Sequence, residues 1–428
     1  MSTVNNNRVK QSAANKKTAR TRVQKAPPDF QLLILTLILT GFGLLMVFSA
    51  SSSVTLLGKK FEYNPLYFTM SQFQYAILGI IVMLVVMNIP YKRFKKLFIP
   101  MFLITFLMLV VVLFMPAVNG AHSWITIGKL FSFQPTELAK ISTILYLSAL
   151  IAKKGDKFRD LRSGFMPVIV IVSFVAGLVM LQPDLGSCMI LVSACFLVIY
   201  AGGASLKHIL GSVAILVIIL GLFLGGKALL THQTADETSA SSNYQVGRIQ
   251  AYLNPFADEK GSTQNLLNSL IAIGEGGVTG AGYGQSVQKL SYLSNAHNDF
   301  IFAIIGEEFG FIGTAVFLLL YLYFLWRGLL VSLRCPDVFG TLTGVGIVGL
   351  IGIQAFINIG GVSNTIPLTG VTLPFISAGG TSLLITLFSM GILLSISRDS
   401  KKAVPAVKEE KSQTVTVPER RTALYRSR

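Results

Sequence analysis

Charged side chains are scarce in this chain of 428 residues: Asp, Glu, Lys and Arg make up 13% of it, whereas hydrophobic residues make up 52%. A soluble domain carries about 25% charged residues. A soluble globular fold is therefore excluded, and the mean hydropathy of +0.64 indicates a protein that crosses a membrane several times.

Cysteine and histidine are also scarce, with three and four residues. Cys188, Cys195 and Cys335 lie in or beside apolar segments without metal-ligand spacing, so we predict no disulfide framework. The chain has no Walker loop, no His-Glu-x-x-His pair and no Ser/His/Asp nucleophile elbow. These absences argue against nucleotide hydrolases, zinc proteases and serine hydrolases, and we assign no metal site.

Long apolar segments, by contrast, are abundant. Ten segments lie near the 17–25 residues that a bilayer requires. They are 31–50, 73–90, 97–115, 137–152, 165–181, 187–201, 208–229, 299–326, 340–360 and 380–397. The sequence therefore predicts an all-α polytopic membrane protein with ten transmembrane helices.

The basic residues are distributed unequally between the two sides of this arrangement. With the N-terminus in the cytoplasm, 28 of the 36 Lys and Arg residues fall in cytoplasmic segments and six fall in outer loops. Cytoplasmic loops of membrane proteins carry an excess of Lys and Arg. We therefore predict that both termini are cytoplasmic and that one large extracytoplasmic loop, residues 230–298, joins helices 7 and 8.

Two tails flank the membrane domain, which we place at residues 29–398. Residues 1–28 hold seven Lys or Arg and no acidic residue, and residues 399–428 form the second tail. We expect both tails to be disordered and the basic N-terminal one to lie near anionic lipid headgroups. The placement of the formal net charge of +17 matters more than its sum, and we predict no nucleic-acid partner. Contact of the two basic tails with cytoplasmic division proteins is the alternative to adhesion to the lipid surface.

The large loop contains a glycine-rich run, residues 272–284, with six glycines in eleven residues. Such a run does not form a stable helix interior, and glycine permits positive φ and close backbone approach. A nucleotide-binding loop is disfavoured because no strand precedes the run and it faces away from ATP. Two interpretations stay open, a flexible surface loop and a backbone lining for a headgroup site.

Asp299 lies where the polar loop gives way to the eighth apolar segment, and Glu307 and Glu308 lie within that segment. An ionisable residue at membrane depth is costly and indicates function by default. The alternative for Asp299 is an N-cap of the following helix. Glu307 lies eight residues further along, roughly 12 Å deeper at 1.5 Å per residue, so we expect a structural role for it.

Other polar residues lie on the same predicted side. Glu137 and Lys140 are three residues apart and share a helix face; the structural alternative is a buried pair that fixes helix packing. Trp124 is placed as an interfacial tryptophan, and the last outer loop, residues 366–382, has no charge. An ion channel or a secondary transporter with inverted repeats is disfavoured. The pattern indicates a membrane enzyme or carrier that acts on an amphiphile at the outer face.

Several motifs resemble those of the SEDS proteins (shape, elongation, division and sporulation), the FtsW/RodA/SpoVE group of bacterial peptidoglycan glycosyltransferases. Their order and spacing agree over about residues 30–400, and the resemblance is greater to the division branch, FtsW, than to the elongation branch. The matching stretches are Gln134–Lys140, Gln182–Gly186, Tyr244–Ile249, His297–Ala303, Gly306–Gly310, Asn358 and Pro367–Ser382.

The resemblance implies ten helices and polymerisation of lipid II into glycan strands at the outer face of the cytoplasmic membrane. It implies that Asp299, in the His-x-Asp-Phe motif, is the catalytic residue. The substrate-binding candidates are Arg248, Lys140, Glu137, Trp124, His297, Gln245 and Ser377. The chain departs from the family pattern at His122-Ser123, Ser294-Asn295 and Ala378, which lie around the outer rim.

The expected reaction is an inverting displacement, in which Asp299 acts as the base and Arg248 and Lys140 face the departing pyrophosphate. No cofactor is assigned; a divalent cation, Mg²⁺ or Mn²⁺, that bridges Asp299 and the pyrophosphate is the rival role for the aspartate. Competing functions are a lipid II flippase and a non-catalytic division scaffold. By resemblance, the partners are a class B penicillin-binding protein and other divisome membrane proteins, and the location is the division septum.

Overall fold

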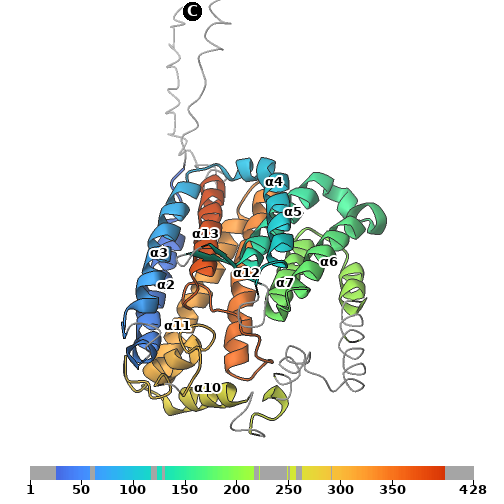
Figure 1. Ribbon diagram of the computed structural model, residues 1–428. Helices are drawn as coiled ribbons and strands as arrows, with labels where there is room; N and C mark the ends of the chain where they lie inside the picture. Colours follow the sequence, from blue (N-terminus) through green and yellow to red (C-terminus); the bar gives the residue numbers. More distant parts are fainter. Residues whose placement is uncertain are drawn as a thin grey trace, which may run out of the picture.

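The computed structural model describes residues 26–57, 63–116, 123–127, 131–215, 221, 248, 251–256, 263–290 and 292–400. The predicted disordered tails lie almost entirely outside these residues, as do Gln245 and the first part of the predicted loop, residues 230–247. The remainder forms a helical bundle with one short hairpin (Figure 1).

Seven helical stretches within the described residues are long and apolar enough to cross a membrane. Five are the helices α2 (Phe30–Leu57), α3 (Tyr67–Val86), α11 (Ile301–Leu333), α12 (Val338–Val362) and α13 (Gly380–Ser400). In the other two, α4 (Phe94–Val112) follows the short turn η2 (Tyr91–Arg93), and α6 (Met166–Met180) follows the π-helical turn η4 (Leu161–Phe165). The chain is a polytopic helical membrane protein, as predicted.

The remaining predicted segments are helical but shorter or more polar. Segment 137–152 corresponds to α5 (Pro135–Lys154), and segment 187–201 to α7 (Leu185–Ala201), which has 17 residues. Segment 208–229 is helical over Leu206–Ile215, and the residues that follow are mostly outside the described part. The count of ten helices and their orientation across the membrane stay predictions.

Helix α5 shows how the sequence sets these boundaries. Pro135 occupies its first turn, where a missing N–H costs nothing, and Glu137 adds a negative charge near the same end. Lys153 and Lys154 lie in its last turn, and Gly155 follows with φ 54°, a conformation that favours glycine. The short turn η3 (Gly155–Arg159) then leads into η4.

Two apolar cores form the interior, and α12 contributes to both. One contains buried side chains of α2, α3, α11 and α13. The other contains those of α5, α6 and α7. Ile347 and Ile351 of α12 belong to the first core and Leu350 and Ile357 to the second. Figure 1 accordingly shows α12 between the two groups of helices.

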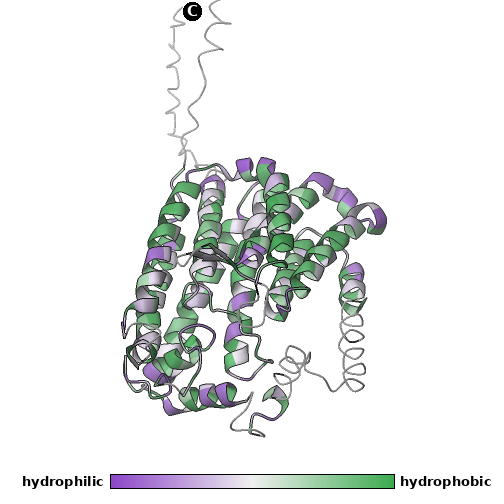
Figure 2. Cartoon of the chain, in the orientation of Figure 1, coloured by the Kyte–Doolittle hydropathy of each residue, from purple (hydrophilic) through white to green (hydrophobic). Residues whose placement is uncertain are grey.

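The two ends of the bundle bring together the segments that the predicted topology assigns to opposite sides. At the first, the Asp29 end, Arg327 forms an ion pair of 2.6 Å with Asp29, whose amide donates to Ser397. The second, the Asp299 end, comprises residues 123–127, 131–134, 182–186, 283–290, 292–300 and 363–380. Figure 2 shows mainly hydrophobic helices between hydrophilic residues at η3–η4 and at the amphipathic helix α10 (Gln264–Glu275).

The Asp299 end also carries the only sheet in the described residues, the antiparallel hairpin of β1 (Ile125–Ile127) and β2 (Phe131–Phe133). The hydroxyl of Thr381, in the first turn of α13, donates to the carbonyl of Ser132 at 2.8 Å. Ser123 donates to the carbonyl of Gln182 at 3.4 Å. The hairpin is thus tied to α13 and to the turn before α7.

Candidate functional site

Asp299 lies in the last turn before α11, at the Asp299 end of the bundle, with its side chain half-buried. The helix begins at Ile301 with Phe300 as its N-cap, and no side chain caps it. The N-cap interpretation of Asp299 is therefore wrong. Within the described residues, no hydrogen-bond donor reaches the carboxylate, so it is available to a ligand.

Gly370, in the connection between α12 and α13, brings Asp299 and Arg248 together. Its φ of +75° favours glycine, and a Cβ placed there would lie 2.9 Å from Nη2 of Arg248 and 3.4 Å from Oδ2 of Asp299. The carboxylate and the guanidinium therefore face the same point above Gly370. Arg248 is far from Asp299 in sequence, and only the fold juxtaposes them.

Burial dominates the electrostatics of this cluster. Desolvation raises the pKa of Asp299 from 3.8 to about 7, partly opposed by the positive charge of Arg248 and reinforced by the negative charge of Asp184. Desolvation also lowers the pKa of His297 from 6.5 to about 4, so this imidazole is neutral at physiological pH. Its ring lies 4.2 Å from that of Phe68. A carboxyl group near pKa 7 is suited to accept a proton.

Asp184 reaches the cluster from the start of α7. Its carboxylate accepts from the amide of Ser187 at 2.9 Å, which caps the helix, and from Nε2 of Gln134 at 3.4 Å. Gly186 packs against the backbone of Thr369. The turn before α7 and the residue before α5 are thus held beside the 366–380 connection.

Glu137 and Lys140 form a buried ion pair of 2.8 Å on α5, with side chains 9% and 1% exposed. The ammonium also lies 3.4 Å from Oε1 of Gln354 on α12. Nε2 of Gln354 donates in turn to the carbonyl of Thr372 at 3.1 Å. Lys140 thus already has two protein partners, which favours the structural alternative over a direct contact with a pyrophosphate.

Ser377 and His297 are tied into the backbone of the same connection. The hydroxyl of Ser377 accepts from the amide of Leu373 at 2.7 Å. The carbonyl of His297 accepts from the amide of Ala378 at 2.9 Å. The Ser377 bond therefore closes a turn within the connection, whereas the His297 bond holds the connection against the segment that carries Asp299.

The remaining predicted site residues are less well placed by the fold. Trp124 is half-buried beside β1, and Gln245 lies outside the described residues. Among the residues that are described, no three of His, Cys, Asp and Glu are grouped so as to hold a metal ion. A cation at Asp299 would therefore need further ligands from the substrate.

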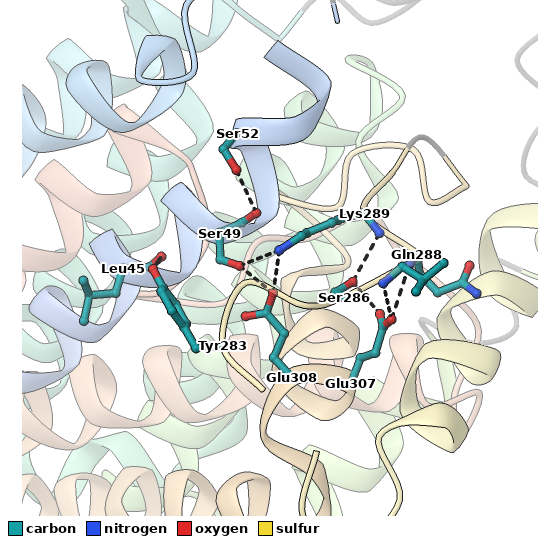
Figure 3. A network of polar contacts seen from close by, with 10 residues as sticks. Leu45, Ser49, Ser52, Tyr283, Ser286, Gln288, Lys289, Glu307 and Glu308 are labelled. Atoms are coloured by element: carbon teal, nitrogen blue, oxygen red, sulfur yellow. Dashed lines mark hydrogen bonds and ion pairs between the residues drawn. The ribbon is translucent and has the colours of Figure 1, made fainter. Parts of the chain in front are cut away.

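A second carboxylate cluster lies deeper, within α11 (Figure 3). Oε1 of Glu308 accepts from the ammonium of Lys289 at 2.9 Å and from the hydroxyl of Ser49, on α2, at 2.5 Å. Glu307 accepts from the hydroxyl of Ser286 at 2.5 Å and from the amide of Val287 at 2.6 Å. Both glutamates are 1% exposed. They fasten the segment 286–289 to the helices, as expected for Glu307.

The glycine-rich run has a role that neither sequence interpretation anticipated. Helix α11 is broken at Gly310, with φ 62° and ψ −165°, and the segment 276–282 occupies the break. Four backbone hydrogen bonds of 2.9–3.1 Å join them, from Ala281 N to Glu307 O, Gly282 N to Glu308 O, Phe311 N to Gly277 O and Ile312 N to Val278 O. A Cβ at Gly276, Gly280 or Gly310 would overlap the opposing backbone.

Sequence reasoning missed Gln354, Lys289 and Ser49, and gave Asn358 no role. Gln354 and Asn358 are polar residues four apart in an apolar segment, so they share a helix face, and this signal was available. Lys289 lies in the predicted outer loop 230–298, and nothing in the local sequence pairs it with Glu308. Ser49 lies 259 residues from Glu308.

Comparison with known proteins agrees with the sequence resemblance. A family model described as "Cell cycle protein", FtsW/RodA/SpoVE, matches residues 30–402. The chain is 40% identical over 383 residues to stage V sporulation protein E of Bacillus subtilis, covering 88% of this chain and 99% of that protein. It is 37% identical to the "Probable peptidoglycan glycosyltransferase FtsW" of Geobacter metallireducens, covering 87% and 95%.

Two solved structures share the fold. One is described as "Structural coordination of polymerization and crosslinking by a peptidoglycan synthase complex", with a TM-score of 0.67, 25% identity, and coverage of 87% of this chain and 98% of that one. The other is the rod shape determining protein RodA of Thermus thermophilus, with a TM-score of 0.61, 26% identity, and coverage of 87% and 97%. The chain therefore belongs to the FtsW/RodA/SpoVE family of cell-cycle proteins.

Proposed function

We propose that this protein is a peptidoglycan glycosyltransferase that polymerises lipid II into glycan strands at the outer face of the cytoplasmic membrane. The family relationship supports the activity, since relatives carry the name peptidoglycan glycosyltransferase. The observation that carries the site is the Asp299 carboxylate, which has a pKa of about 7 and faces the same point as the Arg248 guanidinium.

The reaction is a single inverting displacement. The 4-hydroxyl oxygen of an acceptor GlcNAc attacks the anomeric carbon of a MurNAc whose pyrophosphate is linked to the lipid. The new C–O bond forms as the bond from that carbon to the pyrophosphate oxygen breaks, and the lipid pyrophosphate leaves with the electron pair. Asp299 accepts the hydroxyl proton, a step that typically contributes 10²–10⁴-fold to the rate.

The leaving pyrophosphate needs positive charge. Arg248 supplies it, because its guanidinium lies beside Asp299 over Gly370 and presents paired donors to phosphate oxygens. Lys140 acts indirectly, through its contacts with Glu137 and Gln354. In the rival role, Asp299 is a ligand of a divalent cation that neutralises the pyrophosphate. Activity without added Mg²⁺ or Mn²⁺, in the presence of a chelator, would contradict this rival role.

The setting is the division septum, with both termini in the cytoplasm and ten helices across the membrane. The partner is a class B penicillin-binding protein, which crosslinks the new strand, together with other divisome membrane proteins. A relationship to a structure of a complex of polymerisation and crosslinking supports such a pairing. The chain has relatives of both the division and the sporulation type. Depletion of the protein during vegetative growth distinguishes the two roles, because a block in septation supports the division role.

The test of the activity is glycan-strand synthesis from purified lipid II. Wild type and Asp299→Asn are each reconstituted in liposomes with the partner transpeptidase. We expect polymer from the wild type and a loss of about 10²–10⁴-fold in the variant, with equal folding and partner binding. Undiminished polymer from the variant contradicts the role of Asp299. Lipid II that crosses the bilayer without polymer from either protein indicates a flippase instead.

The orientation has a test of its own. The three native cysteines, Cys188, Cys195 and Cys335, are buried, so an introduced cysteine is labelled over a low background. Gln264→Cys, on the exposed start of α10, is expected to react with an impermeant maleimide from outside, whereas Asp156→Cys, in η3, reacts only after permeabilisation. The reverse pattern would contradict the predicted topology.

A further inference from the structure

We infer that two amides on one face of α12, Asn358 and Gln354, are positioning residues that hold the catalytic aspartate and the 366–380 connection at a fixed separation. The inference rests on the proposed function of Asp299, and it concerns residues that have no direct part in the displacement described above. The main observation is a pair of hydrogen bonds donated by the side-chain nitrogen of Asn358.

Nδ2 of Asn358 donates both of its hydrogens to backbone carbonyls. One belongs to Asp299, at 2.7 Å, and the other to Val371, at 2.7 Å. Val371 directly follows Gly370, over which the Asp299 carboxylate and the Arg248 guanidinium meet. One buried side chain, 3% exposed, therefore spans the two backbone segments that form the catalytic cluster.

Gln354 repeats this arrangement one helical turn earlier. Its Nε2 donates to the carbonyl of Thr372 at 3.1 Å, and its Oε1 lies 3.4 Å from the ammonium of Lys140. Residues four apart lie on one helix face, so the two amides hold consecutive carbonyls of the connection. The contacts of Gln354 continue through Lys140 to Glu137 at 2.8 Å, which links α5 to the 366–380 connection.

The hydrogen-bond balance of Asn358 favours a positioning role over a simple contribution to stability. Oδ1 of Asn358 is buried and has no hydrogen-bond partner in the described residues. An unpaired buried acceptor is unfavourable, and each such group in a native structure calls for an explanation. Here both carbonyls require donors, which fixes the orientation of the amide and leaves its oxygen unpaired. The side chain thus bridges the two backbone segments while its own oxygen stays without a hydrogen bond in the described residues.

These hydrogen bonds would control the distance between the Asp299 carboxylate and the attacking hydroxyl. In-line displacement requires the base to lie within hydrogen-bond reach of the attacking hydroxyl, and a misplacement of about 1 Å costs roughly 10²-fold in rate. Asp299 and Gly370, over which the Arg248 guanidinium lies, come from different segments, so their relative position depends on whatever connects those segments. Asn358 supplies that connection on the α12 side, and Ala378 N to His297 O, at 2.9 Å, supplies it on the α13 side.

The experiment uses the full chain with its partner transpeptidase and three variants. Asn358→Leu removes both donors at nearly constant size. Gln354→Met removes the second amide with a side chain of similar shape. Asn88→Asp is the matched control, because Asn88 lies at the opposite end of the bundle, beside Arg398. Each protein is measured for kcat and KM with lipid II, for thermal unfolding, and for hydrogen–deuterium exchange of the peptides covering residues 296–303 and 370–376.

We expect kcat to fall roughly 10²-fold in Asn358→Leu and about 10-fold in Gln354→Met, with KM changed less than about threefold. Exchange should accelerate in both peptides and stay unchanged in Asn88→Asp. A rise in KM with unchanged kcat would show a substrate contact and overturn the inference. Wild-type kcat and exchange in Asn358→Leu would overturn it as well.

Two further outcomes separate this inference from the proposed function. If Asn358→Leu does not fold, the same measurements on Gln354→Met decide, since it leaves the Asp299 carbonyl bonded. If the wild type forms no polymer but exchange accelerates in the variants, the proposed function fails while the positioning of these segments stands. If polymer forms and the variants exchange like the wild type, the positioning fails while the function stands.

Discussion

Asp299 and the pair Glu307–Glu308 lie within ten residues of one another, yet their surroundings are opposite. Glu307 accepts from Ser286 and Val287, and Glu308 accepts from Lys289 and Ser49. The Asp299 carboxylate, in contrast, accepts from no donor in the described residues. Glu308 is buried with a cation at 2.9 Å, whereas Asp299 faces a point that it shares with a guanidinium.

This difference favours a structural role for Glu307 and Glu308 and a chemical role for Asp299. A buried charge is tolerated when it is paired or hydrogen-bonded. Glu308 is paired with Lys289 and accepts from Ser49 through Oε1, although its Oε2 has no partner in the described residues. Glu307 has no ion pair in the described residues but accepts hydrogen bonds from Ser286 and Val287. A carboxylate without donors has its charged form destabilised, which raises its pKa and makes it a better base. Ionisable groups with a pKa shifted in this way are concentrated at functional sites. The comparison predicts that the glutamates affect stability and that Asp299 affects chemistry.

The largest effect on stability is expected at Glu308. Glu308→Ala leaves Lys289 buried without its carboxylate, which typically costs 3–5 kcal/mol. Thermal unfolding in detergent measures it. The control is Asp399→Asn, whose ion pair with Lys92 is 3.9 Å long with a lysine side chain 64% exposed, and which should change stability by less than about 1 kcal/mol. Equal effects at the two sites would contradict the comparison.

These two clusters also show what the sequence reveals. The apolar segments predict most helix ends to within a few residues, except that α2 continues to Leu57, α3 begins at Tyr67 and α11 continues to Leu333. At α11, the charge of Arg327, which follows the predicted segment, is paired with Asp29, so the helix continues past it. The position of Asp299 at the edge of an apolar segment likewise follows from local pattern.

The partners do not follow from local pattern. Lys289 meets Glu308 because segment 276–289 folds back onto α11, and that depends on the break at Gly310. The run of glycines signals close backbone approach, yet not which backbone it approaches. Arg248 and Gly370 lie beside Asp299 only in the packed fold. Tertiary contacts between distant segments are thus the part that the sequence alone leaves open.

The next prediction concerns the backbone contacts between segment 276–282 and the break in α11 at Gly310. Gly310→Ala places a side chain in a backbone conformation that only glycine adopts readily, at a cost of about 1–3 kcal/mol, and it overlaps Gly280 in addition. The matched control is Gly177→Ala in α6, where a Cβ meets nothing within 4 Å and the change is expected to be neutral or slightly stabilising. Thermal unfolding of both variants tests it. A tolerated Gly310→Ala would show that segment 276–282 is not locked into α11.

A smaller effect is expected from Asp299→Asn, and its sign is stabilising. The pKa of Asp299 is raised in the folded protein from 3.8 to about 7, so its contribution to stability is present at low pH and lost as pH rises through about 7. The variant cannot ionise. Its stability relative to wild type should therefore grow by about 1–2 kcal/mol between pH 6 and pH 8, measured by thermal unfolding at each pH. A constant difference would indicate that Asp299 has an ordinary pKa.

The smallest effect is a shift in the pH dependence of catalysis. As a base, Asp299 must be ionised, so kcat rises with pH through about 7. Arg248 lowers this pKa and Asp184 raises it. Arg248→Gln should therefore move the acidic limb of the kcat profile upward by roughly one pH unit, whereas Arg248→Lys keeps the charge and should leave the limb in place even if the rate falls. A limb that stays fixed in Arg248→Gln would mean that a group other than Asp299 titrates. It would contradict the role of Asp299 as the base, which distinguishes it from the two glutamates.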